Sequence, residues 1–345
     1  MITNIILNIK ATLKEALVKL DANPEMQTLF IEERNKIVGT VTDGDIRRGL
    51  INGLSNKNSI DDFMISGFTF LEKGKYEKEK LDFIKEKKLE IIPVLNNDGS
   101  LFRIINFNVV KTILPIDAVI MAGGVGSRLM PLTKDTPKPM LEIGGKPIME
   151  YNVDLLKSYG ISHLTLSVKY RAEIIEDYYK DGTSKGINIS YVTENEPLGT
   201  IGAVKQIKEF HNDYILVMNS DLLTNINLEA MFNELLNNNA DMIVATTDYR
   251  VQIPYGVIES DGIKITALKE KPIYTYYSNA GIYIFKKEMI DLIPAHSHFN
   301  ATDLLEKGIG LNKTIMHYSI NNYWLDIGKH IDFEKAQKDV KNLKF

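Results

Sequence analysis

Residues 118–140, AVIMAGGVGSRLMPLTKDTPKPM, combine glycines and cations at a spacing that suits a polyphosphate. The apolar run Ala118 to Met121 predicts a buried strand, and three glycines follow it within five residues. Such glycines let the backbone approach phosphates, and successive N–H groups can cradle them. Arg128 and Lys138 would add fixed positive charge. An ordinary glycine-rich turn would explain the glycines but not the two cations.

Two better-known glycine loops are excluded by single positions. A dinucleotide-binding G-x-G-x-x-G that starts at Gly124 would need a glycine where the chain has Leu129, which excludes a dehydrogenase of that type. A P-loop, G-x-x-x-x-G-K-[ST], would need a glycine in place of Met140 and a serine or threonine in place of Pro147.

The remaining pattern resembles the signature of sugar-1-phosphate nucleotidyltransferases, G-G-x-G-x-R-L-x-P-L-T followed by P-K-P. The chain matches every fixed position, and the resemblance runs from about Pro115 to Phe345. It implies a Rossmann-like, glycosyltransferase-A-like α/β domain with a mostly parallel sheet. It also implies nucleotide binding by Ala122, Gly123, Gly124, Gly126, Ser127, Arg128, Glu194, Gly199 and Thr200.

Two aspartates are expected to hold Mg²⁺. Asp221 follows the apolar stretch 214–218, and a carboxylate at a strand end beside a triphosphate is placed for this metal. Alone, Asp221 would more simply begin a turn. The resemblance adds Asp326, within YWLDIG, as the second magnesium ligand, and Mg²⁺ needs only one or two carboxylates besides phosphate oxygens.

The sugar phosphate is expected to bind further along the chain. The resemblance assigns Lys271 of Glu270-Lys271-Pro272 to the phosphate and Glu270 to sugar hydroxyls, and it adds Gly256 and Asn279 to the sugar pocket. A lone Glu-Lys-Pro would be a surface turn, so its position between the two aspartates supports the assignment. We predict a hairpin just before it, over residues 255–272.

The family chemistry needs no protein nucleophile. The resemblance implies in-line attack of the sugar phosphate on the α-phosphorus, with Arg128, Lys138, Asp221 and Asp326 as the catalytic set. The six histidines show no metal-ligand spacing. Glu194 is predicted to select GTP, because a carboxylate can accept both adjacent donors of guanine. The alternative is that Glu194 is a solvated charge at a strand end.

Composition bounds the class of protein. With 345 residues, we expect two domains, and a net charge of −4 does not favour a nucleic-acid partner or an acidic membrane surface. The chain has no cysteine, so disulfides and thiolate chemistry are excluded. We expect no transmembrane span, a cytoplasmic location and a homo-oligomer.

Residues 1–113 form the first expected domain, with two weak repeats over about residues 1–55 and 56–113. Each copy is predicted as helix, strand, strand, helix, with the last helix starting near Val109. GTVTDGDIRRGL, residues 39–50, resembles a CBS domain, which implies that Thr42 and Asp45 bind phosphate and ribose of an adenine nucleotide. The second copy lacks this pair. A CBS pair that only packs and dimerises is the alternative.

Residues 116–345 form the second expected domain, in which strands and helices alternate, as in a mostly parallel sheet covered on both faces. In such sheets, ligands bind beyond the carboxyl ends of the strands. The expected strands are 117–121, 163–168, 188–193, 214–218, 241–247 and 281–285. The expected helices are 148–159, 171–180, 201–210 and 227–238.

Together these features predict a sugar-1-phosphate guanylyltransferase that joins GTP to a hexose 1-phosphate. The two-domain arrangement resembles the guanylyltransferases of bacterial legionaminic-acid biosynthesis, which implies glucosamine 1-phosphate as the sugar. Mannose- or heptose-1-phosphate guanylyltransferase is the alternative within this class. A nucleotide-sensing regulatory subunit with an inactive transferase fold is the alternative outside it.

Overall fold

The computed structural model describes residues 5–343, and the chain divides into two compact units, Met1–Ile113 and Leu114–Phe345. Each unit has its own buried cores. No helix in the described part of the chain is long and apolar enough to cross a membrane.

The N-terminal unit repeats one topology. In each copy a parallel strand pair is joined through a helix, and an antiparallel strand follows. The first copy comprises β1 (Ile6–Asn8), α1 (Leu13–Asp21), β2 (Thr28–Glu33), β3 (Lys36–Thr42) and α2 (Asp43–Ile51). The second comprises β4 (Leu71–Glu72), α3 (Lys78–Glu86), β5 (Ile91–Leu95) and β6 (Leu101–Asn106).

The helix expected from Val109 is wrong. Residues 107–113 form turns and irregular backbone, and Val109 is exposed. Residues 107–114 separate β6 from Pro115, and the β-branched Val109 and Val110 in this short segment disfavour a helix.

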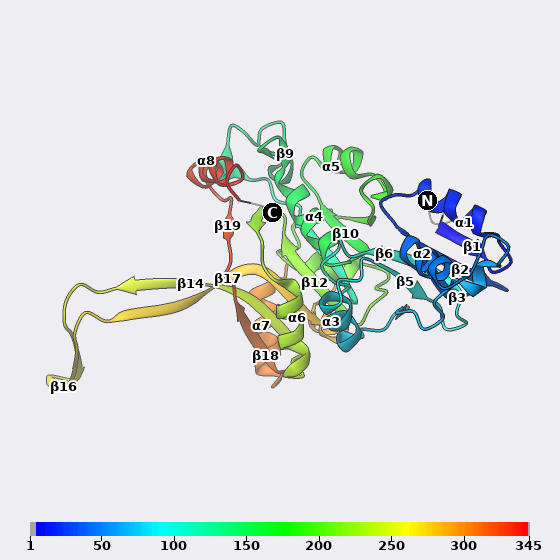
Figure 1. Cartoon of the computed structure of the whole chain (residues 1–345). Coiled ribbons are helices and arrows are strands. Elements are labelled where there is room, and N and C mark those ends of the chain that lie inside the picture. The colour runs from blue at the N-terminus through cyan, green and yellow to red at the C-terminus, as the bar shows by residue number, and fades with distance from the viewer. Residues whose placement is uncertain (1–4, 344–345) are drawn as a thin grey trace. The chain divides into compact units, whose positions relative to one another are not determined.

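The C-terminal unit is built on a seven-stranded sheet with the order β11-β10-β7-β12-β17-β14-β18 (Figure 1). Every neighbouring pair that excludes β17 is parallel, and β17 runs antiparallel to both of its neighbours, so the predicted mostly parallel sheet is confirmed. Its strands are β7 (Ile116–Ala122), β10 (His163–Val168), β11 (Asn188–Thr193), β12 (Tyr214–Asn219), β14 (Met242–Gln252), β17 (Ile273–Lys286) and β18 (Ile315–Ser319).

Helices and short ladders complete this unit. The helices are α4 (Ile148–Ser158), α5 (Ala172–Tyr179), α6 (Leu228–Asn237), α7 (Ala301–Gly310) and α8 (His330–Asp339). The ladders are β8 (Glu142–Ile143) with β9 (Lys146–Pro147), β13 (Leu222–Thr224) with β19 (Trp324–Asp326), and the predicted hairpin β15 (Val257–Asp261) with β16 (Lys264–Lys269).

The helix expected over 201–210 is wrong, because only a 3-10 turn, Gly202–Gln206, forms there. The N–H groups of Ile201 and Gly202 both donate to the carbonyl of Phe299, 3.1 Å away in each case. This segment therefore packs against the chain before α7, and the tertiary contact outweighs the helical pattern.

Candidate active site

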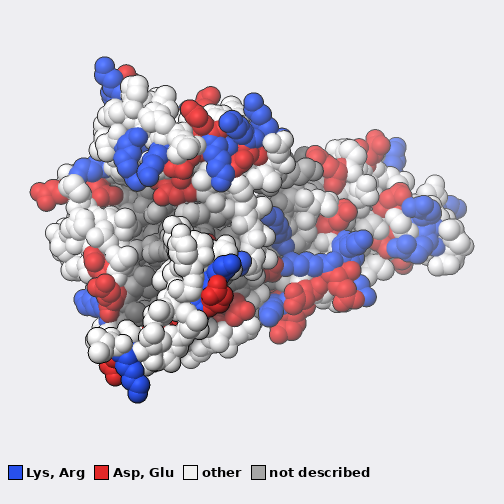
Figure 2. All heavy atoms as spheres, turned by 90° about the vertical axis from the view of Figure 1, so that its left-hand side faces the viewer, with Lys and Arg blue, Asp and Glu red and all other residues white. Residues whose placement is uncertain are grey.

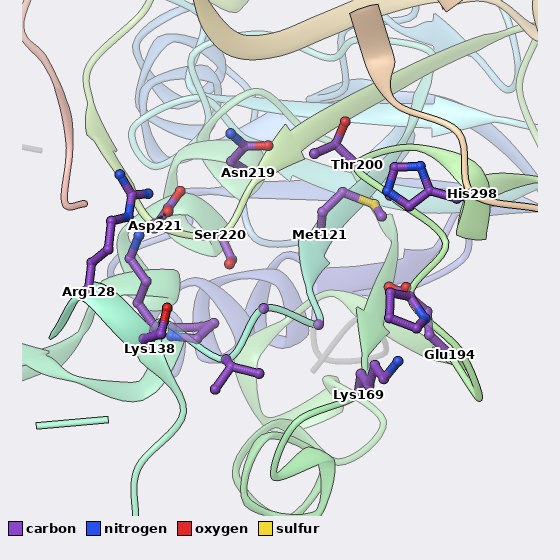
Figure 3. A pocket seen from close by; sticks show the side chains of 18 residues that line it. Met121, Arg128, Lys138, Lys169, Glu194, Thr200, Asn219, Ser220, Asp221 and His298 are labelled. Atoms are coloured by element: carbon purple, nitrogen blue, oxygen red, sulfur yellow. Dashed lines mark hydrogen bonds and ion pairs between the residues drawn. The ribbon is translucent and has the colours of Figure 1, made fainter. Parts of the chain in front are cut away.

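A cavity of about 520 Å³ lies beyond the carboxyl ends of β7, β10 and β12 (Figure 3). This is the place where parallel α/β sheets bind their ligands. The predicted glycine loop forms one wall. The lining residues are Met121, Gly123, Gly124, Val125, Gly126, Ser127, Arg128, Lys138, Pro139, Lys169, Glu194, Pro197, Gly199, Thr200, Asn219, Ser220, Asp221 and His298.

Gly126 shows why the loop needs glycine. Its φ is +67°, and a Cβ there would lie 2.9 Å from Cβ of Lys138 and 3.0 Å from Cγ2 of Thr133. The Thr133 hydroxyl donates to the Gly126 carbonyl over 2.9 Å. The loop is thereby held directly against the segment that carries Lys138, which keeps this cation at the cavity wall.

Lys138 and Asp221 line the charged end of the cavity, and the predicted magnesium ligand Asp326 lies next to them without being a lining residue. The Lys138 side chain is largely buried and forms an ion pair with Asp221, and its Nζ lies 3.9 Å from Oδ1 of Asp326. The β13–β19 ladder pairs Leu222 with Asp326, and the Ile327 N–H donates to the Asp221 carbonyl over 3.1 Å. This ladder brings the two distant carboxylates to one place. Figure 3 shows Arg128 beside Asp221 at the same end.

The electrostatics of this end favour an added cation. Burial first, and then the neighbouring Asp221 carboxylate, raise the pKa of Asp326, while Lys138 and Arg128 oppose the rise. Oδ1 of each aspartate is buried and accepts no hydrogen bond from any described residue. Two such oxygens beside a phosphate site fit Mg²⁺, which binds through one or two carboxylates and substrate phosphates. Among the described residues, no larger cluster of metal-binding side chains occurs.

Glu194 lies at the other end of the cavity and is 7% exposed. Its Oε1 accepts a hydrogen bond of 2.6 Å from the Ser167 hydroxyl, and its Oε2 accepts one of 3.1 Å from the Leu198 N–H. The alternative of a solvated strand-end charge is therefore wrong. A carboxylate has about four lone-pair positions, so each oxygen keeps one for a ligand.

Gly199 and Thr200 follow Glu194 along the same wall. Gly199 has a φ of +77°, and a Cβ there would lie 2.6 Å from the Phe299 carbonyl oxygen. The Thr200 hydroxyl accepts from the Ala301 N–H over 2.9 Å. These contacts join the 194–200 segment to the start of α7 and hold both residues at the cavity.

Several lining residues had no place among the predicted site residues. Lys169 directly follows β10, and the strand-end rule that located Asp221 could have located it too. Asn219 ends β12 and was open to the same argument. His298 reaches the cavity through the hydrogen bond from the Phe299 N–H to the Leu198 carbonyl, 2.8 Å long, which no local pattern indicates.

The structure leaves other predicted residues away from the cavity. Ala122 is fully buried and does not line it. Gly256, Glu270 and Lys271 lie at or beside the β15–β16 hairpin, on an extension of β14 and β17 that contributes nothing to the lining (Figure 1). Asn279 is nearer, because its side chain accepts from the Gly281 N–H, and Gly281 packs against the cavity residue Asn219.

The N-terminal unit has a cavity of its own, also about 520 Å³. Thr42 lines it, but Asp45 does not. Asp45 Oδ2 accepts from the N–H and hydroxyl of Thr42, and Oδ1 accepts from Arg48 over 2.6 Å. These bonds make Asp45 part of the capping box that begins α2, so the predicted ribose contact lacks a free carboxylate at the cavity. Other lining residues include Asp43, Gly44, Arg47, Phe68 and Thr69.

Relatives of the C-terminal unit include several sugar-phosphate enzymes. The D-glycero-α-D-manno-heptose 1-phosphate guanylyltransferase of Aneurinibacillus thermoaerophilus is 32% identical over 230 residues, which are 66% of this chain and 99% of the relative. A mannose-1-phosphate guanylyltransferase of Mycobacterium tuberculosis is 31% identical over 65% of this chain, which spans 64% of that relative. A UTP–glucose-1-phosphate uridylyltransferase of Synechocystis is 32% identical over 66% of this chain, which spans 65% of it.

Solved structures agree with this grouping. HddC from Yersinia pseudotuberculosis, complexed with GMP-PN, superimposes with a TM-score of 0.51 at 28% identity, over 65% of this chain and 99% of HddC. The family described as nucleotidyl transferase matches residues 117–342, a range that holds the glycine loop, Glu194 and both aspartates. The chain therefore belongs to the nucleotidyl transferase family and is a nucleotidyltransferase.

Proposed function

We propose that this protein is a sugar-1-phosphate guanylyltransferase that converts GTP and a hexose 1-phosphate to a GDP-sugar and pyrophosphate. The observation that carries the proposal is that one cavity has a carboxylate for a base at one end and a charged, phosphate-binding group of residues at the other. Glu194 lies buried at one end, and Lys138 and Asp221 line the other end, where Asp326 lies beside them. Relatives that act on heptose and mannose 1-phosphates with GTP support the same class of reaction.

The chemistry requires positioning and charge neutralisation rather than a covalent intermediate. A phosphate oxygen of the sugar phosphate attacks the α-phosphorus of GTP, the bond to the bridging oxygen breaks, and pyrophosphate leaves with the electron pair. The loop N–H groups and Arg128 hold the leaving phosphates. Lys138 stabilises the charge that develops on the α-phosphate. Mg²⁺ held by Asp221 and Asp326 would neutralise phosphate charge.

Glu194 is the proposed reader of the base. Guanine presents N1–H and N2–H₂ side by side, and a carboxylate with one lone pair left on each oxygen can accept both. Uracil presents one donor flanked by acceptors, which suits a carboxylate less well. A uridylyltransferase is among the relatives, so family membership alone does not fix the base, and we propose that Glu194 does so in this chain.

The sugar is proposed to be glucosamine 1-phosphate, made into a precursor for legionaminic acid or another surface glycan. The support is the resemblance of the two-unit arrangement to the guanylyltransferases of that route. Mannose and heptose 1-phosphates are the alternatives that the relatives favour. Lys271 is proposed to bind the sugar phosphate, with Glu270, Gly256 and Asn279 near the sugar.

One panel tests this proposal. Four nucleoside triphosphates are incubated with glucosamine, mannose, heptose and glucose 1-phosphates, and pyrophosphate release is measured with Mg²⁺ and with EDTA. GTP with glucosamine 1-phosphate should give the highest kcat/KM, and EDTA should abolish turnover. Pyrophosphate release with UTP or dTTP but not with GTP would refute the guanylyl assignment. No pyrophosphate release with any pair of substrates would favour the inactive regulatory subunit.

A second function is proposed for the N-terminal unit, as a CBS pair that binds an adenine nucleotide. Its cavity offers the Arg47 guanidinium for phosphate and the Phe68 ring for stacking, whereas the Thr42 hydroxyl already donates to Asp45. Isothermal titration with AMP, ADP and ATP tests it, with Arg47→Ala as the variant. Equal affinity of wild type and variant, or no binding by the wild type, would refute this site.

A further inference from the structure

The ribbon formed by residues 248–279, called the arm here, contains no buried residue. It comprises the outer ends of β14 and β17 with the β15–β16 hairpin, and it extends away from the central sheet (Figure 1). Figure 2 views the protein from the side to which the arm extends, and much of the near surface there is uncharged. Its exposed large apolar side chains are Tyr249, Val251, Tyr255, Ile258, Ile263, Ile265, Leu268, Ile273, Tyr276 and Tyr277.

The apolar side chains of the arm are arranged in cross-strand pairs. Tyr249 lies opposite Tyr276, and Val251 lies opposite Tyr274, so these four side chains share one face of the β14–β17 ribbon. In the hairpin, Ile258 pairs with Leu268, at 56% and 66% exposure. Such rows are typical of a buried sheet face rather than a solvated one.

A two-stranded ribbon is at best marginally stable in water without further packing, and the arm is tied to the central sheet only at its base. Large exposed apolar patches are uncommon on monomeric proteins, and the arm exposes apolar side chains on more than one strand and on both faces. The arm therefore needs a covering surface.

The base of the arm is held in its extended direction. The Ser319 hydroxyl donates to Asp248 over 2.8 Å, and the Tyr277 ring lies 4.5 Å from the His317 ring. The ladder continues without a register shift from Thr246↔Asn279 to Gln252↔Ile273, and its one bulge lies inside the central sheet. These contacts oppose folding of the arm back onto its own chain.

The part of the arm where the β15–β16 hairpin joins β14 and β17 also carries groups that could bind a ligand. Lys271 is exposed and has a φ of +43°, a backbone conformation uncommon for a residue other than glycine. A Cβ on Gly256 would lie 3.1 Å from Oε2 of Glu270, so this carboxylate lies on the same face as Leu268. No arm residue lines the active-site cavity of its own chain.

We propose that two copies of this chain exchange arms, so that Lys271 and Glu270 of each copy complete the cavity of the other. The occupant of the apolar face is thus a second copy, in an isologous dimer whose two arms are used alike. The assignment of Lys271 to the sugar phosphate rests on the proposed function, whereas the docking of the arm on a second copy rests on the exposed rows and the anchored base.

Complementation between inactive variants tests the exchange. The Lys271→Ala variant has a defective arm and an intact cavity. The Asp221→Asn variant has an intact arm and a defective cavity. The two are co-expressed with different tags, and mixed dimers form at random. Half of the dimers are then mixed, and each has one complete site, so pyrophosphate release should recover to about a quarter of wild type.

The matched control pairs Asp221→Asn with Asp326→Asn, which both alter the same magnesium-binding end of one chain, at or beside its cavity. This pair should stay inactive. No recovery from the first pair, when the two tags co-purify, would overturn the exchange, because it would place Lys271 in the cavity of its own chain. Equal recovery in both pairs would also overturn it.

Cross-linking decides the same question without activity, because the chain has no cysteine of its own. A Lys271→Cys chain is mixed with a Val125→Cys chain, since Val125 lines the cavity and is 48% exposed. A short bis-maleimide should join the two chains, and Ile309→Cys, 62% exposed on α7, replaces Val125→Cys as the control. A chain that carries both Lys271→Cys and Val125→Cys should link to a second copy. A link formed only within that one chain would overturn the proposal.

The two readouts separate the possible failures. If wild type releases no pyrophosphate, or if Lys271→Ala turns over normally, the proposed function or the role of Lys271 fails. The cross-link between chains would still form if the arms are exchanged. If turnover requires Lys271 but no link between chains forms, the proposed function stands and the exchange is wrong.

Discussion

Replacing Glu194 by glutamine tests base selection with little disturbance of the fold. The carboxylate accepts one hydrogen bond from the Ser167 hydroxyl and one from the Leu198 N–H. The Leu198 N–H can only donate, so the glutamine carbonyl must face it. The amide NH₂ then faces Ser167, whose hydroxyl can rotate and accept. Both protein contacts survive, and the Tm should change little.

The groups that residue 194 presents to a bound base change more than its contacts with the protein. The carboxylate offers one free lone pair on each oxygen, whereas the glutamine side chain offers one free lone pair and one N–H. Guanine loses an acceptor for one of its two donors, and hydrogen bonds to charged groups contribute roughly 1.5–3 kcal/mol. Since 1.36 kcal/mol corresponds to tenfold in rate, kcat/KM for GTP should fall by about ten- to a hundredfold.

Steady-state kinetics with GTP, UTP and dTTP measure the effect. The variant should also narrow the gap between GTP and UTP, because its N–H can meet a carbonyl of uracil. Ser167→Ala is the matched control: it removes one bond to the carboxylate and should lower kcat/KM while keeping the preference for GTP. An unchanged ratio of GTP to UTP in Glu194→Gln would refute the proposal that this residue reads the base.

Four further outcomes are expected. Asp221→Asn and Asp326→Asn should each lower kcat by orders of magnitude with the fold retained by circular dichroism, and near-normal turnover would make that aspartate structural. In EDTA, Asp326→Asn should raise the Tm, since burial and the Asp221 charge disfavour its carboxylate; a lower Tm would contradict this. Asp45→Ala should lower the free energy of unfolding of the N-terminal unit by about 1 kcal/mol in urea titrations, through loss of the α2 capping box, and Asp45→Asn should lower it less, because its amide oxygen can still accept from Thr42 although the bond from Arg48 is lost. A chain shortened to residues 114–345 should keep catalysis, so complete loss of activity in a folded sample would show that the N-terminal unit is required.

Local pattern was sufficient for most of the elements of the central sheet and for the glycine loop. The apolar run of β7 and the amphipathic helices α4, α5 and α6 lie within two residues of their predicted bounds, because each buries a face that repeats regularly along the chain. The loop was readable because its glycines, Arg128 and Lys138 are close in sequence. The repeat in the N-terminal unit could also be predicted, because each copy is a continuous stretch of the chain with the same order of elements.

Tertiary contacts decided what the local pattern could not. The 201–210 segment pairs with Phe299 instead of forming a helix, and Asp45 caps α2 instead of facing a cavity. The extension of β14 and β17 into an arm depends on strand pairing between residues far apart in the chain, which periodicity within either strand does not reveal.

The amino-acid sequence by itself determined the family chemistry, because a phosphate-binding loop is a local device whose backbone and cations adjoin one another. Only the tertiary structure decided how the site is assembled. The β13–β19 ladder brings Asp326 to Asp221, the packing before α7 brings His298 to the cavity, and the arm carries Lys271 away from it. Each of these depends on contacts between distant segments, whose free energy belongs to the packed fold and not to any one stretch of residues.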